Sequence, residues 1–227
     1  MRIGICSLIF LHLAVHPCQC AEPEAGSPIK QVAPGIFEIG KVLLNKSDRS
    51  VTIPASINMA EGTVEYLLVS AIGKTHESVL RTEAEPQHIH LAMLLLGAKG
   101  RGTNDFPADK SNPPPGDRVK IEVRWNSAKM RLRAEELVFD RATKAPMPKV
   151  GWIYNGSQMS SEGFAAQQIG SIISLIDDPD ALINNPSPRR DDDDNWRVNG
   201  KALQSPTGRI DVILILPKTA ARSRNDK

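Results

Sequence analysis

The stretch Val119-Lys-Ile-Glu-Val-Arg-Trp125 decides the fold class, because apolar and charged residues alternate along it without interruption. In a β-strand this period of two places the four apolar residues on one face and the charged residues on the other. A polar turn over residues 126–129 leads to a second alternating segment at 130–134. The two segments therefore predict a β-hairpin with one buried face.

Similar alternation recurs along most of the chain and predicts further strands. They cover residues 36–44, 51–59, 64–69, 76–82, 137–139, 152–154, 172–176 and 210–216. The segments 172–176 and 210–216 are apolar on both faces, which is typical of strands in the centre of a sheet.

A single helix is predicted at about residues 85–96. Pro86 suits a first helical turn and Gly97 suits the stop that follows the last one. Apolar residues cover most of its circumference, which predicts a core helix buried against a sheet. The fold class is therefore α+β, a mostly antiparallel sheet with one buried helix, and a sandwich-like arrangement is one form that it could take.

The first twenty residues have the features of a signal peptide. Arg2 is the only charge before the uncharged run 3–15, which is too short to cross a hydrocarbon core of roughly 30 Å as a helix. Pro17 ends the run, and small residues allow cleavage after Cys20 or Ala21. We therefore expect an exported protein that is periplasmic or secreted and has no transmembrane helix in the mature chain.

Cleavage at this point would remove every thiol. Cys6, Cys18 and Cys20 all lie before it, so the mature domain would have no Cys-ligated zinc, iron–sulfur cluster, c-type haem or Cys nucleophile. No cofactor is predicted. The full chain has 28 Lys and Arg against 26 Asp and Glu, and this balance gives no general attraction to nucleic acid.

The predicted strands form one domain at residues 35–216, after a flexible segment at 21–34 and before a tail at 217–227. Two stretches rich in Pro, Gly or Asp, at 97–116 and 177–208, are predicted to be long loops. Loops of this length in a compact domain are usually functional or disordered.

His76, Glu77 and Ser78 place an imidazole, a carboxylate and a hydroxyl side by side. In a catalytic interpretation His76 is the general base for Ser78, with Glu77 as its orienting group. Strand geometry argues against this, because neighbouring side chains point to opposite faces and residues two apart are about 6.5 Å apart along the strand. A structural role is therefore the leading interpretation, and catalysis would need a partner from elsewhere.

The His residues also form a weak candidate metal site. His88 and His90 lie about 200° apart around the predicted helix, so they cannot share an ion. One of them, with His88 as the candidate, could join His76 and Glu77 in a three-ligand site. The run 191–194 of four Asp lacks the alternate ligand spacing and the glycine of a calcium loop, and indicates a solvated loop tip.

The outer face of the central hairpin carries a basic ribbon that is a candidate anion-binding surface. Its members are Lys120, Arg124, Lys129, Arg131 and Arg133. Only Glu122 opposes them on the hairpin itself, and like charges across a sheet repel. Either nearby carboxylates such as Glu135 or Glu136 neutralise the ribbon, or an anionic partner such as an envelope polymer does.

Several blocks of the sequence together resemble a known family. They are Val64-Glu-Tyr-Leu-Leu68, the Gly73-Lys-x-His-Glu-Ser-x-Leu80 block, the helix end at 94–97, Arg133-Ala-Glu-Glu-Leu137, Pro146-Met-Pro148, the segment 152–157 and Asp178-Pro-Asp-Ala-Leu-Ile-Asn184. This pattern resembles the YdjY-domain family of bacterial exported proteins over about residues 35–216. The resemblance implies a single exported domain and no particular activity.

Two functions follow as alternatives. The leading hypothesis is a non-catalytic module that binds a protein or envelope component at the periplasm or cell surface, because residues 21–227 contain no Cys, no phosphate-binding loop and no nucleophile elbow. The alternative is a hydrolase or metal-dependent enzyme that uses His76 with Glu77, Ser78 and another residue. The oligomeric state is left open.

Overall fold

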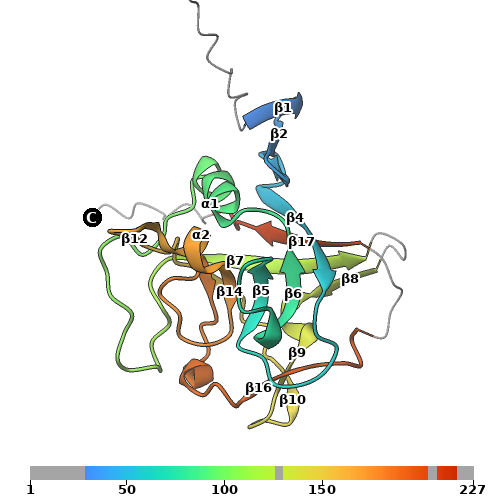
Figure 1. The fold of residues 1–227 in the computed structure, drawn as a ribbon, viewed down its shortest axis with the longest axis vertical. Coiled ribbons are helices and arrows are strands. Elements are labelled where there is room, and N and C mark those ends of the chain that lie inside the picture. Colours follow the sequence, from blue (N-terminus) through green and yellow to red (C-terminus); the bar gives the residue numbers. More distant parts are fainter. Residues whose placement is uncertain (1–28, 126–129, 204–208, 219–227) are drawn as a thin grey trace, which may run out of the picture.

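A computed structural model of the 227-residue chain describes residues 29–125, 130–203 and 209–218. The predicted signal peptide at 1–20, most of the segment 21–34, the hairpin turn with Lys129, and the end of the tail lie outside the described residues. Strands dominate the rest of the chain (Figure 1).

The strands of the described chain are β1 Ile29–Ala33, β2 Ile36–Ile39, β3 Val42–Asn45, β4 Ser50–Ile57, β5 Tyr66–Ser70, β6 Ser78–Thr82, β7 Asp117–Trp125, β8 Met130–Arg133, β9 Val138–Asp140, β10 Ala145–Pro146, β11 Trp152–Tyr154, β12 Met159–Ser160, β13 Gly163–Phe164, β14 Ser171–Ser174, β15 Ile183–Asn184, β16 Trp196–Val198 and β17 Ile210–Ile215. The helical elements are α1 Pro86–Leu95, α2 Ala165–Ile169 and the 3-10 turns η1 Thr75–Glu77, η2 Ala134–Leu137 and η3 Pro188–Asp191.

Eight of these strands close into a barrel. Their order is β4-β17-β7-β11-β15-β14-β5-β6, and β6 pairs again with β4. Two neighbouring pairs are parallel, β14 with β15 and β5 with β6, and the others are antiparallel. The expectation of a mostly antiparallel sheet is thus confirmed, but the sandwich-like form is wrong because the sheet closes on itself.

Strand β4 makes the closure possible, since it changes partner along its length. Its first residues pair with β3 as far as Thr52, and its last two, Ser56 and Ile57, pair with β6. Pro54 lies between the two pairings, where a residue without a backbone N–H costs the sheet little. Strands β1 to β3 therefore extend from the barrel as an antiparallel meander (Figure 1).

The central hairpin of β7 and β8 is confirmed, with Val123 opposite Leu132. The single strand expected at 36–44 is wrong, because the chain turns at Gly40 and forms β2 and β3 instead. Gly40 has a φ of +54°, and a Cβ at this position would lie 2.2 Å from Nδ1 of His88. Only glycine accommodates both the turn and this close approach.

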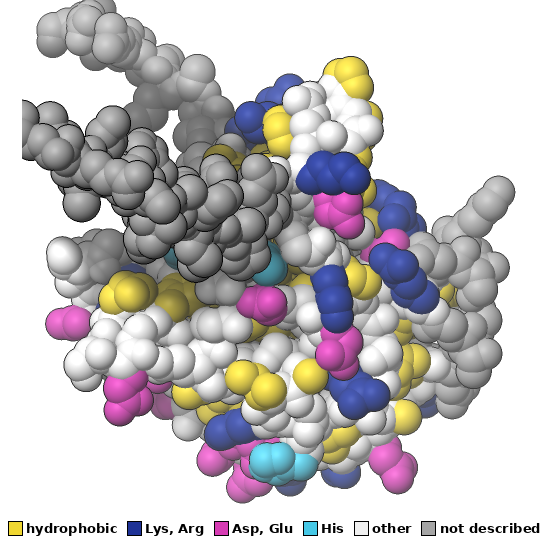
Figure 2. Space-filling model, turned by 45° about the horizontal axis from the view of Figure 1, so that its top comes forward, with side chains coloured by type: hydrophobic (Ala, Val, Ile, Leu, Met, Phe, Trp, Pro, Cys, Tyr) yellow, Lys and Arg dark blue, Asp and Glu magenta, His cyan; other side chains and the backbone are white. Residues whose placement is uncertain are grey.

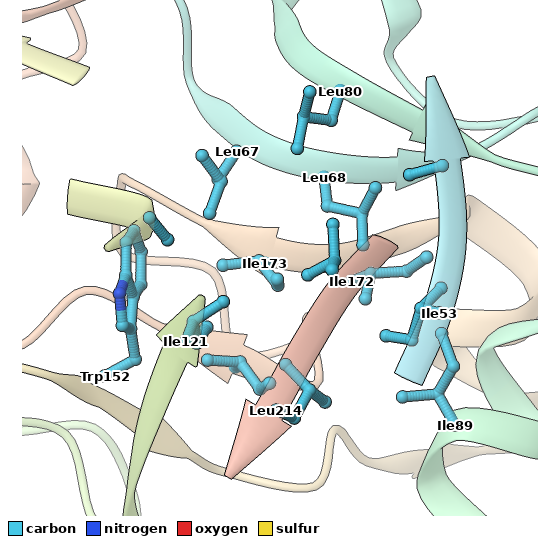
Figure 3. Close-up of a cluster of buried hydrophobic side chains, with 14 of the residues drawn as sticks. Ile53, Leu67, Leu68, Leu80, Ile89, Ile121, Trp152, Ile172, Ile173 and Leu214 are labelled. Atoms are coloured by element: carbon cyan, nitrogen blue, oxygen red, sulfur yellow. The ribbon is translucent and has the colours of Figure 1, made fainter. Parts of the chain in front are cut away.

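The core lies inside the barrel and under α1. Figure 3 shows Leu67, Leu68 and Leu80 facing Ile172 and Ile173, with Ile89 of α1 beside Ile53. All of these side chains are fully buried. Their burial supplies most of the driving force for folding, at about 1.5–3 kcal/mol per large apolar side chain.

Helix α1 is confirmed, but not its burial on all sides. Ile89, Ala92 and Met93 face the core, whereas Leu94 and Leu95 are 48% and 42% exposed. A second short helix, α2, was not predicted from the sequence. No helix within the described ranges is long and apolar enough to span a membrane.

Candidate functional site

His76, Glu77 and Ser78 do not form a reactive cluster. His76 and Glu77 lie on η1 and only Ser78 lies on β6, so the strand expected at 76–82 starts later than predicted. The His76 side chain is 75% exposed, with Nε2 3.7 Å from Oε1 of Glu77. Ser78 is fully buried and its hydroxyl donates to the Leu80 carbonyl oxygen at 2.7 Å. No hydrogen bond joins His76 to Ser78 in the described structure.

The candidate metal ligands are also apart. His88 packs against Gly40, whereas His76 lies on η1. Among the residues that the structure describes, no group of three or more His, Cys, Asp or Glu side chains is placed to hold a metal ion. The four Asp residues at 191–194 are exposed.

His90, rather than His88, has a specific partner. Its Nδ1 lies 2.8 Å from the hydroxyl of Tyr154 on β11, and its ring lies 4.8 Å from that of Phe164. Burial lowers the pKa of His90 and raises the pKa of Tyr154. With Nδ1 unprotonated, the neutral imidazole accepts a hydrogen bond from the Tyr154 hydroxyl, which keeps its own proton, and this bond links α1 to β11.

This pair predicts a pH-dependent stability. The pKa of His90 in the folded protein lies below its ordinary value of 6.5, which we take for the unfolded chain. As the pH falls through 6.5, the unfolded chain therefore binds a proton that the folded protein does not, and unfolding becomes more favourable. The free energy of unfolding should therefore be unaffected by this group above about pH 7.5 and decline below about pH 6.5.

We expect His90→Gln to flatten the decline, measured by urea unfolding between about pH 7.5 and pH 5. His76→Gln is the control, since His76 is exposed. An unchanged pH profile in the His90 variant would refute the role of this pair.

Each described cation of the basic ribbon is paired with a carboxylate, and Lys120 and Arg131 share one, Glu122. Glu122 lies 2.5 Å from Lys120 and 3.0 Å from Arg131, while Asp211 on β17 lies 2.8 Å from Arg124. Glu135 pairs with Arg133 as expected, whereas Glu136 pairs with Lys149. Side chains of both signs are also interspersed over the visible described surface in Figure 2. Three carboxylates of the domain thus compensate part of the charge of the four described cations.

Three of the sequence blocks meet around Tyr66. The Lys74 ammonium lies 5.5 Å above the Tyr66 ring and 3.0 Å from Oε2 of Glu65. The Tyr66 hydroxyl donates to Asp178 at 3.1 Å. Burial and the Asp178 charge raise the pKa of Tyr66, so it remains protonated as the donor. The arrangement connects β5, η1 and the segment after β14.

The two long loops are joined by one buried cation, Arg190 of η3. Its Nε donates to Asp177 at 2.8 Å, and its two terminal nitrogens donate to the carbonyl oxygens of Lys110, Ser187 and Asn112 at 2.8–3.0 Å. Lys110 also pairs with Asp177. The Arg190 side chain is fully buried, so these bonds replace its entire hydration. These bonds tie the segment 97–116 to the segment 177–208. The prediction of one long loop at 177–208 is wrong, because this segment contains β15, η3 and β16.

Beside this junction lies a groove of about 290 Å³, here called the proline groove. Three segments of the chain form it, and its lining residues are Ser111, Pro113, Arg118, Met147, Pro148, Val150, Pro186, Ser187, Pro188 and Arg189. Six of the ten are apolar and four of these are prolines. Among the apolar lining residues Met147 and Pro186 are buried, and they are here called the floor of the groove. The exposed lining residues, such as Val150 at 51%, are called its wall.

The comparison with known families matches the YdjY domain model to residues 42–216. The chain belongs to the YdjY-domain family. No curated protein and no solved structure matches it in the corresponding comparisons.

The YdjY domain of this chain begins with β3 and ends directly after β17. It therefore contains every strand of the barrel, both long loops and the whole proline groove, whereas β1 and β2 precede it.

Sequence reasoning missed the proline groove in the YdjY domain. The signal was present in the prolines of the two loops and in the Pro146-Met-Pro148 block. What the sequence did not indicate was that these stretches come together, because no local periodicity relates them.

Proposed function

We propose that this YdjY domain is an exported, non-catalytic binding module that takes its partner in the proline groove. The observation that carries the proposal is the groove itself: a mostly apolar concavity, built by three distant segments and fixed by the fully buried Arg190. Apolar concavities of about this size are the common form of a ligand site in proteins.

The groove is preorganised for binding. Proline fixes its own φ angle, so the prolines at 113, 148, 186 and 188 lose little backbone freedom when a partner arrives. Arg190 ties the backbone at Lys110 and Asn112 to η3, next to the groove wall. A rigid surface of this kind binds with a smaller entropic cost than a flexible loop.

The lining supports binding more than catalysis. It contains two Ser and two Arg, but no His, Cys, Asp or Glu that could act as a general base. The hydroxyl of Ser187 accepts a hydrogen bond from the backbone N–H of Arg189 and caps η3. The Ser187 hydroxyl at the groove thus has a structural role.

Export is supported by the features of residues 1–20. Mass spectrometry of the protein recovered from the cell envelope should give a chain that starts at Ala21 or Glu22 and has no reactive thiol. A recovered chain that retains Cys6 would contradict cleavage at this site.

The binding role can be tested with N-phenyl-1-naphthylamine, an uncharged fluorescent probe. We expect the folded wild-type protein to enhance its emission, and Val150→Asp to weaken binding by roughly ten-fold, since a charge would then stand on the apolar wall. Ile72→Asp is the matched control, because Ile72 is an apolar residue that is 69% exposed away from the groove. Equal binding by both variants would overturn the proposal.

A further inference from the structure

The proline groove carries one positive charge that the protein does not neutralise. Its only charged lining residues are Arg118 and Arg189. Arg118 is exposed, and one of its terminal nitrogens donates to the Val150 carbonyl oxygen at 3.0 Å. No carboxylate in the described ranges 29–125, 130–203 and 209–218 forms an ion pair with Arg118.

Arg189 differs, because its charge is already compensated. It pairs with Asp140, whose side chain is fully buried, and about a third of the Arg189 side chain is exposed. Asp140 also accepts hydrogen bonds from the backbone N–H groups of Ala142 and Thr143. The surplus at the groove is therefore the single charge of Arg118.

An occupant that fits this surface has an apolar part and one negative charge. We propose that the groove binds a peptide segment of a partner protein, with an apolar side chain against the prolines and an adjacent carboxylate paired with Arg118. This inference rests on the proposed function, and it adds the chemical class of the ligand. The planar guanidinium of arginine suits a carboxylate better than the ammonium of lysine does.

The shape of the groove favours a peptide. Its floor at Met147 and Pro186 is buried, whereas Pro113, Pro148 and Pro188 remain exposed along its walls. A polypeptide can thus place one side chain on the floor while its backbone continues over the exposed walls. The volume of about 290 Å³ accommodates one large side chain and its neighbour rather than a long segment.

The experiment uses two peptides, acetyl-Gly-Gly-Phe-Glu-Gly-Gly-amide and the same peptide with Gln in place of Glu. Affinities are measured with the full mature protein by NMR titration. We expect the Glu peptide to bind about five-fold tighter than the Gln peptide. Arg118→Gln should remove the difference, and Arg118→Lys should keep part of it.

Arg197→Gln is the control for general electrostatics, because Arg197 is exposed, lies outside the groove and has no ion pair among the described residues. It should keep the five-fold preference of the wild-type protein. Loss of the preference in this variant would mean that overall charge, and not Arg118, selects the peptide.

The outcomes separate the two proposals. If both peptides bind equally and Val150→Asp still weakens the naphthylamine probe, the carboxylate inference fails while the binding function stands. If 4-phenylbutyrate binds more tightly than the Glu peptide, the occupant is a small carboxylate and the assignment to a partner protein is wrong. If neither the peptides nor the naphthylamine probe binds, the proposed function itself fails.

Discussion

Replacing Arg190 by Met is expected to lower the free energy of unfolding by about 3 kcal/mol or more. The guanidinium is fully buried and donates to Asp177 and to three backbone carbonyl oxygens. Methionine fills part of the volume but donates no hydrogen bond, so the carbonyl oxygens of Lys110, Asn112 and Ser187 would lose a charged partner.

Urea unfolding followed by tryptophan fluorescence measures this loss, because Trp125, Trp152 and Trp196 are all buried. Arg197→Met is the control, since Arg197 is exposed on β16 and a surface change of this kind costs within about 0.5 kcal/mol. A loss in Arg190→Met no larger than in the control would show that the two loops do not depend on this residue.

The same variant connects stability with function. Arg190 holds the segment before Pro113 against η3, so its loss should loosen the groove even in molecules that remain folded. We therefore expect Arg190→Met to bind the naphthylamine probe more weakly than wild type under conditions where both proteins are native.

Gly170→Ala is expected to lower the free energy of unfolding by about 2–4 kcal/mol, because the position combines a positive φ with a close contact. Gly170 ends α2 with a φ of +76°, where an L-residue is strained. A Cβ would lie 2.5 Å from Oγ of Ser70 and 2.7 Å from Cα of Gly73, so the backbone would have to move.

Gly97→Ala provides a matched control for this prediction. Gly97 follows α1 with a φ of +82°, and nothing lies within 4 Å of a Cβ built there. Its substitution by Ala should lower the free energy of unfolding by about 1–2 kcal/mol, which is the backbone strain alone. Thermal or urea unfolding of both variants separates strain from contact. If both variants lost the same free energy of unfolding, the close approach of Gly170 to Gly73 would add nothing to the cost of the Gly170 substitution.

Local patterns in the sequence predicted individual elements well. The alternation at 119–125 became β7, and Pro86 and Gly97 marked the ends of α1 closely. The prediction failed where a local conformation depends on a distant contact. Gly40 turns the chain beside His88 of α1, and the His76 segment forms η1 before β6 begins, so both segments were assigned to longer strands than they contain.

The candidate site shows the same division. The basic ribbon was visible in the sequence, and so were Glu122 and Glu135 as partners, but Asp211 became a third partner only because β17 pairs with β7. Alternation along one strand does not reveal which strand will lie beside it.

The sequence by itself determined most of the longer strands, the main helix, the absence of Cys from residues 21–227 and the resemblance to the YdjY-domain family, because these depend on residue type and short-range period. The closure of the barrel, the pairing of Asp211 with the ribbon and the proline groove were decided only by the tertiary structure. Lys110 and Arg190 are 80 positions apart, and they meet because the folded core brings their loops together and excludes water from the bonds between them.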